Sequence, residues 1–300
     1  MAKAIYSISF PGDGNIGYAV GEAGIIMKST NSGETFELLS SPTQNNLYGV
    51  CFPLDHQVGF AVGAKGTILK TDNGGKDWRV IKIDTELDLH SLCFPQTDLI
   101  GFAVGDDGLI IETADSGETW TILHQGGERK LYSVNFPLDT ITGYAVGEHS
   151  IIYKTNNGGE HWFPLTEHLD TEYRFNLYSV WFPFDDLTGY VVGERFCIYK
   201  TTDGGESWKL LTEAFRPYSL YGVRFPSDEY TGLLVGSGGR IFKTNDGLQT
   251  ILPAESGVEE DLYSIYSDTE CERAWVTGAN GTILRTIDGG FTWLKARLNL

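Results

Sequence analysis

Basic residues are scarce in this chain. Its 22 lysines and arginines stand against 40 aspartates and glutamates, which gives a formal net charge of −18 at neutral pH with histidine uncharged. A chain with this balance is repelled by the phosphate backbone of nucleic acids and by anionic membranes unless a local basic patch opposes the overall charge. We therefore expect no nucleic-acid partner.

Cysteines and long apolar runs are also few. The four cysteines, Cys51, Cys93, Cys197 and Cys271, form no CxxC pair and have no partner at zinc-ligand spacing, so we interpret them as buried free thiols. No run reaches the roughly 18 apolar residues of a membrane-spanning helix, so we expect a protein that is not embedded in a membrane. The opening residues MAKAIYSISF contain no apolar stretch of signal-peptide length, so a cytoplasmic location is the default expectation.

What the chain does contain is typical of a folded, turn-rich protein. Hydrophobic residues make up 41% of it and aromatic residues 13%, which is enough to build a large core. The 37 glycines, against only 10 prolines, indicate many tight turns rather than disorder.

The segment GYAVG recurs through the sequence. It or a close relative begins at residues 17, 59, 101, 143, 189, 232 and 274, in steps of 42 residues except for one of 46 and one of 43. Seven copies occupy nearly the whole chain, so we expect one domain over residues 1–300 and no second one. The predicted units are about 4–40, 46–82, 88–124, 130–166, 176–212, 219–253 and 261–297.

Each unit reads as four short strands. In the second unit these are LYGVCFP, GFAVG, GTILKT and WRVIKI, which are rich in β-branched and aromatic residues and separated by Gly, Pro, Asn and Asp. Four strands per unit of ~40 to 45 residues are typical of a propeller blade. We predict an all-β, seven-bladed β-propeller with four antiparallel strands per blade. Because the first unit starts near Ile5 with its own inner strand and the last ends from Trp293 with its own outer strand, we expect closure without strand exchange between the termini.

A polar turn ending in an aromatic residue follows the third strand of most units, as in TDNGGKDW at 71–78. Its Asn or Asp side chain is expected to bond the backbone amides two or three residues on, its glycine permits a positive φ, and the aromatic packs against the sheet. We interpret the turn as structural. The residues assigned to it are Asn31, Asn73, Asp115, Asn157, Asp203, Asp246 and Asp288, with Trp78, Trp120, Trp162, Trp208 and Trp293.

This turn resembles the Asp-box, or BNR repeat, of sialidases and related propellers. Together with FP at the end of the first strand and GYAVG in the second, the pattern is similar to that of the photosystem II stability and assembly factor family. The sixth turn, TNDGLQTI, departs from it by lacking the second glycine and the tryptophan. The resemblance implies a non-enzymatic scaffold that holds a partner, a photosystem II reaction-centre protein in that family, through an arginine-bearing patch. It also implies export, so a signal removed from the chain stays an open alternative.

The sequence offers no catalytic residues, cofactor or metal site. A sialidase needs three arginines around its substrate, yet the first arginine is Arg79, and the nucleophile motif GxSxG does not occur. Carboxylates in the loops between second and third strands, namely Glu22, Asp106, Asp107, Glu148 and Glu194, are interpreted as a solvated rim rather than metal ligands. The histidines are scattered without ligand spacing.

The most irregular sector is units four to six. The connection LTEHLDTEYRFNL carries an insertion, the next one reads LTEAFRPYSL, and the loop GERF lies between them. Arginine and aromatic residues are enriched at binding hot spots, although loops also use aromatics for their own packing. We assign partner binding to this sector on the top face. The candidate residues are Arg174, Arg195, Arg216, Arg224, Arg240, Tyr173, Phe175, Trp181, Phe215 and Tyr218.

The predicted function is therefore protein or peptide binding, with an acidic or C-terminal segment as the expected ligand, by a protein that is monomeric rather than oligomeric. The alternative is a carbohydrate-binding propeller in which Trp181 or the loop aromatics stack on sugar rings. A glycoside hydrolase is the third and weakest interpretation, because no pair of carboxylates across a cleft is identifiable.

Overall fold

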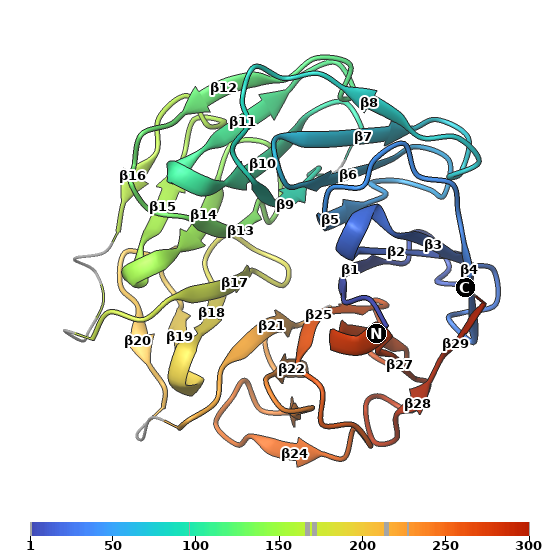
Figure 1. Cartoon of the computed structure of the whole chain (residues 1–300). Coiled ribbons are helices and arrows are strands. Elements are labelled where there is room, and N and C mark those ends of the chain that lie inside the picture. Colours follow the sequence, from blue (N-terminus) through green and yellow to red (C-terminus); the bar gives the residue numbers. More distant parts are fainter. Residues whose placement is uncertain are drawn as a thin grey trace.

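A computed structural model describes residues 2–95, 97–165, 169, 173–212, 216–226 and 228–299. Seven sheets are arranged in a ring around a central channel (Figure 1). In every sheet four strands that are consecutive in sequence pair antiparallel, and the first of them lies innermost. The chain thus folds as the predicted seven-bladed β-propeller.

The strands are short and fall at the same place in each unit. Blade one contains β1 (Ile5–Ser9), β2 (Gly17–Gly21), β3 (Ile26–Ser29) and β4 (Thr35–Leu38). Blade two contains β5 (Leu47–Cys51), β6 (Gly59–Gly63), β7 (Thr67–Thr71) and β8 (Arg79–Ile81). Blade three contains β9 (Leu89–Cys93), β10 (Gly101–Gly105), β11 (Ile110–Thr113) and β12 (Thr121–His124). Blade four contains β13 (Leu131–Asn135), β14 (Gly143–Gly147), β15 (Ile152–Thr155) and β16 (Phe163–Pro164).

The later blades follow the same plan. Blade five contains β17 (Leu177–Trp181), β18 (Gly189–Gly193), β19 (Ile198–Thr201) and β20 (Lys209–Leu210). Blade six contains β21 (Leu220–Arg224), β22 (Gly232–Gly236), β23 (Ile241–Thr244) and β24 (Leu252–Ala254). Blade seven contains β25 (Leu262–Ser267), β26 (Ala274–Gly278), β27 (Ile283–Thr286) and β28 (Leu294–Lys295), and β29 (Arg297–Asn299) follows it.

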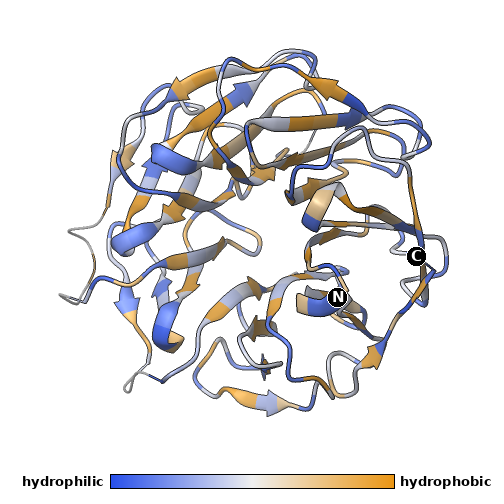
Figure 2. Ribbon diagram, viewed as in Figure 1, coloured by the Kyte–Doolittle hydropathy of each residue, from blue (hydrophilic) through white to orange (hydrophobic). Residues whose placement is uncertain are grey.

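Helical structure in the described ranges is limited to single 3₁₀ turns, and none is long and apolar enough to cross a membrane. Five of these turns join a second strand to a third: η1 (Glu22–Gly24), η2 (Asp106–Gly108), η3 (Glu148–Ser150), η5 (Glu194–Phe196) and η6 (Ala279–Gly281). Hydrophobic residues follow the strands of every blade, whereas η2, η3 and η5 are hydrophilic (Figure 2).

The second strand of each blade is buried along its whole length, which explains its small residues. A side chain at the first glycine of GFAVG, Gly59, would place its Cβ 2.3 Å from the ring of Phe52. At the last glycine, Gly63, a Cβ would lie 2.0 Å from the carbonyl oxygen of Asn46. Only glycine fits where neighbouring backbone and rings approach this closely.

Aromatic side chains fill the space between neighbouring blades. Phe94, from the FP that ends β9, stacks on Phe60 of the preceding blade with ring centroids 4.2 Å apart, and meets Trp120 of its own blade edge-on at 6.0 Å. Offset-stacked and edge-to-face pairs are favourable beyond the area they bury. The same arrangement recurs in Tyr18–Phe52–Trp78, Phe102–Phe136–Trp162 and Tyr144–Phe182–Trp208.

The central channel is lined by the first strands in layers. The second residue of each strand forms a ring of aromatic side chains, with neighbouring centroids between 5.2 and 5.8 Å apart. The ring consists of Tyr6, Tyr48, His90, Tyr132, Tyr178, Tyr221 and Tyr263. The next residue of each strand is serine or glycine, and together these residues line a cavity of about 170 Å³.

The prediction of closure without strand exchange is wrong. β29, at the end of the chain, pairs parallel with β4 in blade one, with Leu298 opposite Phe36. The amide of Arg297 also donates to the carbonyl oxygen of Glu34 at 3.0 Å. The outer edge of β4 presents unpaired backbone groups, and the extended chain after Ala296 satisfies them. Blade one is consequently a five-stranded sheet that contains both ends of the chain.

Candidate functional site

The propeller has two faces with different contents. The turns between third and fourth strands lie beside the loops between first and second strands, because the amide of Gly74 bonds the carbonyl of Gln57 and that of Gly158 bonds the carbonyl of Ile141. We call this side the box face. The loops between second and third strands and the connections between blades form the opposite side, the top face.

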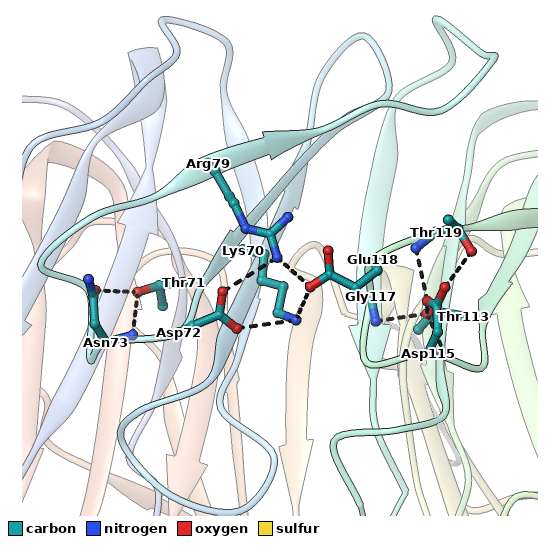
Figure 3. Close-up of polar contacts among 10 residues, drawn as sticks. All are labelled: Lys70, Thr71, Asp72, Asn73, Arg79, Thr113, Asp115, Gly117, Glu118 and Thr119. Atoms are coloured by element: carbon teal, nitrogen blue, oxygen red, sulfur yellow. Dashed lines mark hydrogen bonds and ion pairs between the residues drawn. The ribbon is translucent and has the colours of Figure 1, made fainter.

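On the box face, each turn is organised around one hydroxyl and one carboxylate or amide (Figure 3). In blade three the Thr113 hydroxyl donates to Oδ1 of Asp115 at 2.9 Å and accepts the amide of Gly117 at 2.8 Å. Oδ1 of Asp115 accepts the amide of Thr119, and Oδ2 accepts the Thr119 hydroxyl at 2.7 Å. The bonded amide lies four residues on rather than the expected two or three. The hydroxyl before the box was not singled out from the sequence.

Aspartate and asparagine boxes differ in the partner at this fourth position. Asp203, Asp246 and Asp288 accept a serine or threonine hydroxyl there, at Ser207, Thr250 and Thr292. Asn73 and Asn157 instead donate from Nδ2, to Asp77 and to the ring of His161. Desolvation would raise the pKa of Asp288, but the hydrogen bonds from Thr292, Thr286 and Phe291 outweigh it and hold the pKa at about 2.

The turn also joins neighbouring blades. Buried Lys70 of blade two donates to Glu118 in the box of blade three at 2.7 Å, and Arg79 pairs with the same carboxylate (Figure 3). Gly117 lies against Phe60 of blade two, so that a Cβ on it would be 2.3 Å from that ring. The box is therefore part of an inter-blade contact.

The same contact occurs at other joints. The Tyr18 hydroxyl and the Lys28 ammonium of blade one both donate to the carbonyl oxygen of Gly74 in the box of blade two, at 3.0 and 2.8 Å. Tyr144 and Lys154 of blade four donate likewise to Gly204 of blade five, at 2.9 and 2.7 Å.

The assigned box tryptophans contribute to the core between blades. Trp78, Trp120, Trp208 and Trp293 are buried, and Trp162 is half-buried. The remaining box positions are Asn31, whose Oδ1 accepts the amide of Thr35 at 3.0 Å, and the sixth box, where the sequence departs from the pattern. There Leu248 occupies the glycine position with φ +70° and is buried, and Ile251 stands where the other blades have tryptophan or phenylalanine.

On the top face over blades four to six, the structure brings most of the predicted residues together in two adjoining hollows. The first hollow, of about 830 Å³, is lined by Tyr173, Arg174, Phe175, Glu194, Arg195, Pro217, Tyr218 and Ser219. The second hollow, of about 1390 Å³, is lined by residues that include Phe196, Arg216, Tyr218, Arg240 and Phe242. Tyr218 lines both.

Arginines and aromatic rings stack in these hollows. The guanidinium of Arg240 lies over the ring of Tyr218, 4.2 Å from its centroid, and that of Arg216 lies over Phe196 at 5.7 Å. The Phe196 centroid is 5.3 Å from that of Tyr218 and 5.1 Å from that of Phe242. The amide of Arg216 donates to the carbonyl oxygen of Arg195 at 3.0 Å, which ties the two connecting loops together.

In the first hollow, the rings of Tyr173 and Phe175 stack with centroids 5.7 Å apart, and Nη1 of Arg174 donates to the carbonyl oxygen of Tyr173. Phe175 is buried and held by Ser150, whose hydroxyl donates to its carbonyl oxygen and accepts its amide. Tyr173, Arg174 and Arg195 are exposed.

Three of the predicted binding residues are not in this group. Arg224 and Trp181 end the inner strands β21 and β17, so they lie at the box-face end of the channel, where Arg224 stacks over Trp181 at 3.7 Å. Both are distant from the hollows because the last residue of an inner strand lies at the opposite end from the top-face loops. Phe215 lies outside the described residues.

The sequence analysis missed Phe196 and Phe242, which form the aromatic floor of the second hollow. Phe196 is the last residue of GERF, where four of the other six loops have glycine with φ near +70°, and it adopts φ +64°. In blade one, a Cβ on the corresponding Gly24 would lie 2.1 Å from the carbonyl oxygen of Thr43. A bulky residue in this conformation is unusual and its presence at a hollow is a functional signal.

The carboxylates of the top face mostly cap backbone amides. Glu22 accepts the amide of Ala4, Glu148 that of Lys130 and Glu194 that of Asn176. Asp106 bonds His90 at 2.7 Å and Lys130 at 3.0 Å. Among the residues that the structure describes, no three His, Cys, Asp or Glu side chains are grouped as metal ligands.

The profile of the family described as photosynthesis system II assembly factor YCF48 matches residues 32–126 and 125–217, which is more than half of the chain. The chain belongs to the YCF48 family. Its fold is similar to that of YCF48 bound to D1 peptide, with a TM-score of 0.77 and 21% identity over 95% of this chain and 92% of that one. It is also similar to YCF48 from Cyanidioschyzon merolae, with a TM-score of 0.75 and 17% identity over 95% and 96% of the chains.

More distant similarity in sequence extends to glycoside hydrolases. The GH74 xyloglucanase from Xanthomonas campestris matches with a TM-score of 0.79 at 11% identity, over 97% of this chain but 52% of that enzyme. At this identity the likeness concerns the propeller fold alone. No curated protein sequence is significantly similar to the chain.

Proposed function

We propose that the protein is a non-enzymatic, peptide-binding assembly factor of the YCF48 type, and that the two hollows over blades four to six are its binding surface. The observation that carries this proposal is the convergence of Arg195, Arg216 and Arg240 on the aromatic floor made by Phe196 and Tyr218.

These arginines have charge to offer a ligand. In the described part of the chain no carboxylate forms an ion pair with Arg195, Arg216 or Arg240, although the protein carries a net charge of −18. A guanidinium donates two parallel hydrogen bonds to a carboxylate and stacks on an aromatic ring at the same time. The expected ligand therefore presents a carboxylate, from an acidic side chain or a C-terminus, to this wall of the hollows.

The far wall of the second hollow gives the ligand a direction. Glu255, Glu259 and Glu260 line that side, opposite Arg216 and Arg240. A peptide bound across the hollow would place its carboxylate toward the arginines and a basic or neutral polar group toward the glutamates, since like charges directly opposed are repelled.

The peptide nature of the ligand is supported by the family and by the solved structure of YCF48 bound to D1 peptide. We propose that this chain takes a comparable peptide as a monomer. Catalysis is not part of the proposal, and the GH74 likeness supplies the contrary test. Hydrolysis of xyloglucan, or specific retention on a glycan array, would contradict a dedicated peptide-binding role.

The proposal is tested by replacing Arg174, Arg195 and Arg216 together with glutamate and measuring the fluorescence anisotropy of a labelled D1 peptide. A matched control replaces Lys65, Lys82 and Arg129 with glutamate. These three are exposed, lie in blades two and three or the connections after them, and give the same change in charge. Lys65 occupies the same loop position in blade two as Arg195 in blade five.

We expect the arginine triple variant to lose binding by at least about a hundredfold, with an unchanged melting temperature, whereas the control triple variant binds within about threefold of wild type. Equal losses in the two variants would show that net charge alone drives capture. Wild-type binding by the arginine variant would place the peptide elsewhere on the molecule.

A further inference from the structure

The box-face end of the central channel contains a charged group that the proposed peptide site does not use. The fifth residue of each inner strand forms the last layer of the channel, below the aromatic ring and the serine and glycine layer. This layer breaks the repeat, since the seven blades supply Ser9, Cys51, Cys93, Asn135, Trp181, Arg224 and Tyr266. The other two layers are almost uniform.

Arg224 is held between two aromatic rings in this layer. Its guanidinium carbon lies 3.7 Å from the ring centroid of Trp181 and 5.0 Å from that of Tyr266. The indole nitrogen of Trp181 donates to the carbonyl oxygen of Phe225 at 2.6 Å, which fixes the ring. Flat stacking on Trp181 leaves the edge of the guanidinium, where the N–H donors are, facing sideways.

The guanidinium extends into the channel. Burial raises the pKa of the Cys51 thiol to about 12, and the positive charge of Arg224 opposes that rise. Cys51 belongs to blade two and Arg224 to blade six, which are as far apart around a seven-membered ring as two blades are. A charge that acts on both lies across the channel rather than within its own blade.

This charge has no counter-ion among the described residues. Nε of Arg224 is buried without a hydrogen-bond partner, and the side chain takes part in no ion pair. Burial accordingly lowers the pKa of Arg224. Arg273 provides the contrast, because it lies 5.9 Å over Trp275 but is paired with Asp268 at 2.9 Å and donates to the carbonyl oxygen of Asp13 at 2.7 Å.

There is room for a ligand beside it. The 170 Å³ channel cavity is lined by Val50 and Val223, the residues that directly precede Cys51 and Arg224, so the cavity reaches down to this layer. The hydroxyls of Ser7 and Ser133, which already accept backbone amides from the next blade, keep their protons for donation. A buried, unpaired cation next to a polar cavity is costly unless an anion compensates it.

We propose that the central channel binds a small free carboxylate, of formate or acetate size, as the counter-ion of Arg224. The two carboxylate oxygens match the paired donors of the guanidinium edge, and the channel admits a ligand of this size without rearrangement of the blades. The site is separate from the two hollows and does not depend on the peptide-binding proposal.

The experiment compares wild type with Arg224→Met, which keeps the length of the side chain and removes its charge. The melting temperature is measured against sodium formate and sodium acetate at constant ionic strength, with sodium methanesulfonate as the balancing salt. A ligand that binds only the native state raises the melting temperature. Arg273→Met is the matched control, since it removes an arginine that already has its acceptors.

We expect the wild type and Arg273→Met to melt at higher temperature as formate or acetate rises to tens of millimolar, by about 2 °C or more, and Arg224→Met to be insensitive. Without carboxylate, Arg224→Met should melt no lower than wild type, because an unpaired buried charge has been removed. An equal response in wild type and Arg224→Met overturns the proposal.

A second measurement keeps the test decisive if Arg224→Met does not fold. The line width of ¹³C-labelled acetate is recorded in the presence of wild type or Arg224→Lys, which retains the charge but lacks the planar fork. Broadening by wild type that is at least about fivefold greater than by the lysine variant supports the site. The absence of broadening by wild type overturns it, as does displacement of acetate only by D1 peptide, which would make the occupant a peptide carboxylate.

Discussion

At the turn between third and fourth strands the seven blades are nearly interchangeable, whereas at the loop between second and third strands blades four and five differ from the others. The turn repeats one network of hydroxyl, Asx side chain and glycine amide, and its glycine packs on the blade before it. The loop in blades four and five replaces a left-handed glycine with Ser150 and Phe196. Conserved geometry on one face thus supports variation on the other.

The difference has a physical origin in the connections between blades. In blades one, two and six, a Cβ at the loop glycine would lie between 1.9 and 2.3 Å from a carbonyl oxygen of the following connection, at Thr43, Thr85 and Val258. Where Phe196 stands, the following connection accommodates its ring, and Tyr218 packs against it. A longer or differently placed connection therefore creates the hollow and the space for an aromatic floor together.

The largest expected effect breaks the comparison on the box face. Trp208→Ala removes a fully buried side chain from the core between blades four and five and should cost about 3 to 5 kcal/mol of unfolding free energy. The folded fraction should still capture D1 peptide. Urea denaturation and anisotropy measure the two quantities. Phe163→Ala, at an exposed neighbouring strand position, is the control and should change neither. Lost capture with unchanged stability would make the box a binding element.

The next test asks whether the box contact is the main joint between blades. β29 adds a parallel strand that only the joint between blades seven and one possesses. Ending the chain after Ala296 removes this pairing and should cost about 1 to 3 kcal/mol, from a few backbone hydrogen bonds and the partial burial of Leu298. Thermal unfolding measures it. A cost above that of Trp208→Ala would mean that the terminal strand, rather than the box, holds the ring closed.

The sixth box offers a way to sharpen the comparison. Ile251 stands where most blades have the box tryptophan, and it lines the second hollow together with Leu248. Ile251→Trp restores the consensus and should fill part of the hollow, weakening D1 peptide capture by about tenfold, or ~1.4 kcal/mol. Leu252→Trp adds the same side chain at an exposed position that does not line the hollow, and should leave binding unchanged. Undiminished capture by Ile251→Trp would exclude this part of the hollow from the site.

The smallest expected effect concerns acid stability. The folded-state pKa of Asp288 is about 2, below the usual value near 3.9, so its contribution to stability is complete above about pH 4 and is lost as the pH falls toward 2. Asp288→Asn should make the melting temperature fall less steeply over this interval. Asn31, whose Nδ2 donates to the Thr35 hydroxyl, shows that an amide fits the same turn beside threonine. Identical acid profiles for the two proteins would contradict the assignment.

The fold was predictable because seven copies of one pattern report the same structure independently. The box positions followed from the same repetition, although the amide four residues on and the preceding hydroxyl required coordinates. β29 was missed because the three residues Arg297, Leu298 and Asn299 contain no strand signal of their own. Their conformation comes from the free edge of β4, which is supplied by the other end of the chain.

The candidate site was predictable in outline and not in composition. Arginines in consecutive connections and the loop between them converge because these segments share the top face. Arg224 and Trp181 were grouped with them on irregularity alone, yet the position of a residue along an inner strand fixes its depth in the channel. Phe196 and Phe242 were overlooked because an apolar residue at the edge of a strand looks like ordinary core in sequence.

The stacking of each box turn on the blade before it has a consequence for the order of folding. Almost every joint is built from units that are neighbours along the chain, such as Phe60 with Phe94, so blades are able to assemble one after another as the polypeptide is synthesised. The joint between blades seven and one is different, since its contacts, such as Arg285 with Glu34, link residues 251 positions apart. Closing the circle is then the slow final event, and a circular permutant that begins at Asn46 should move that event to the joint between blades one and two.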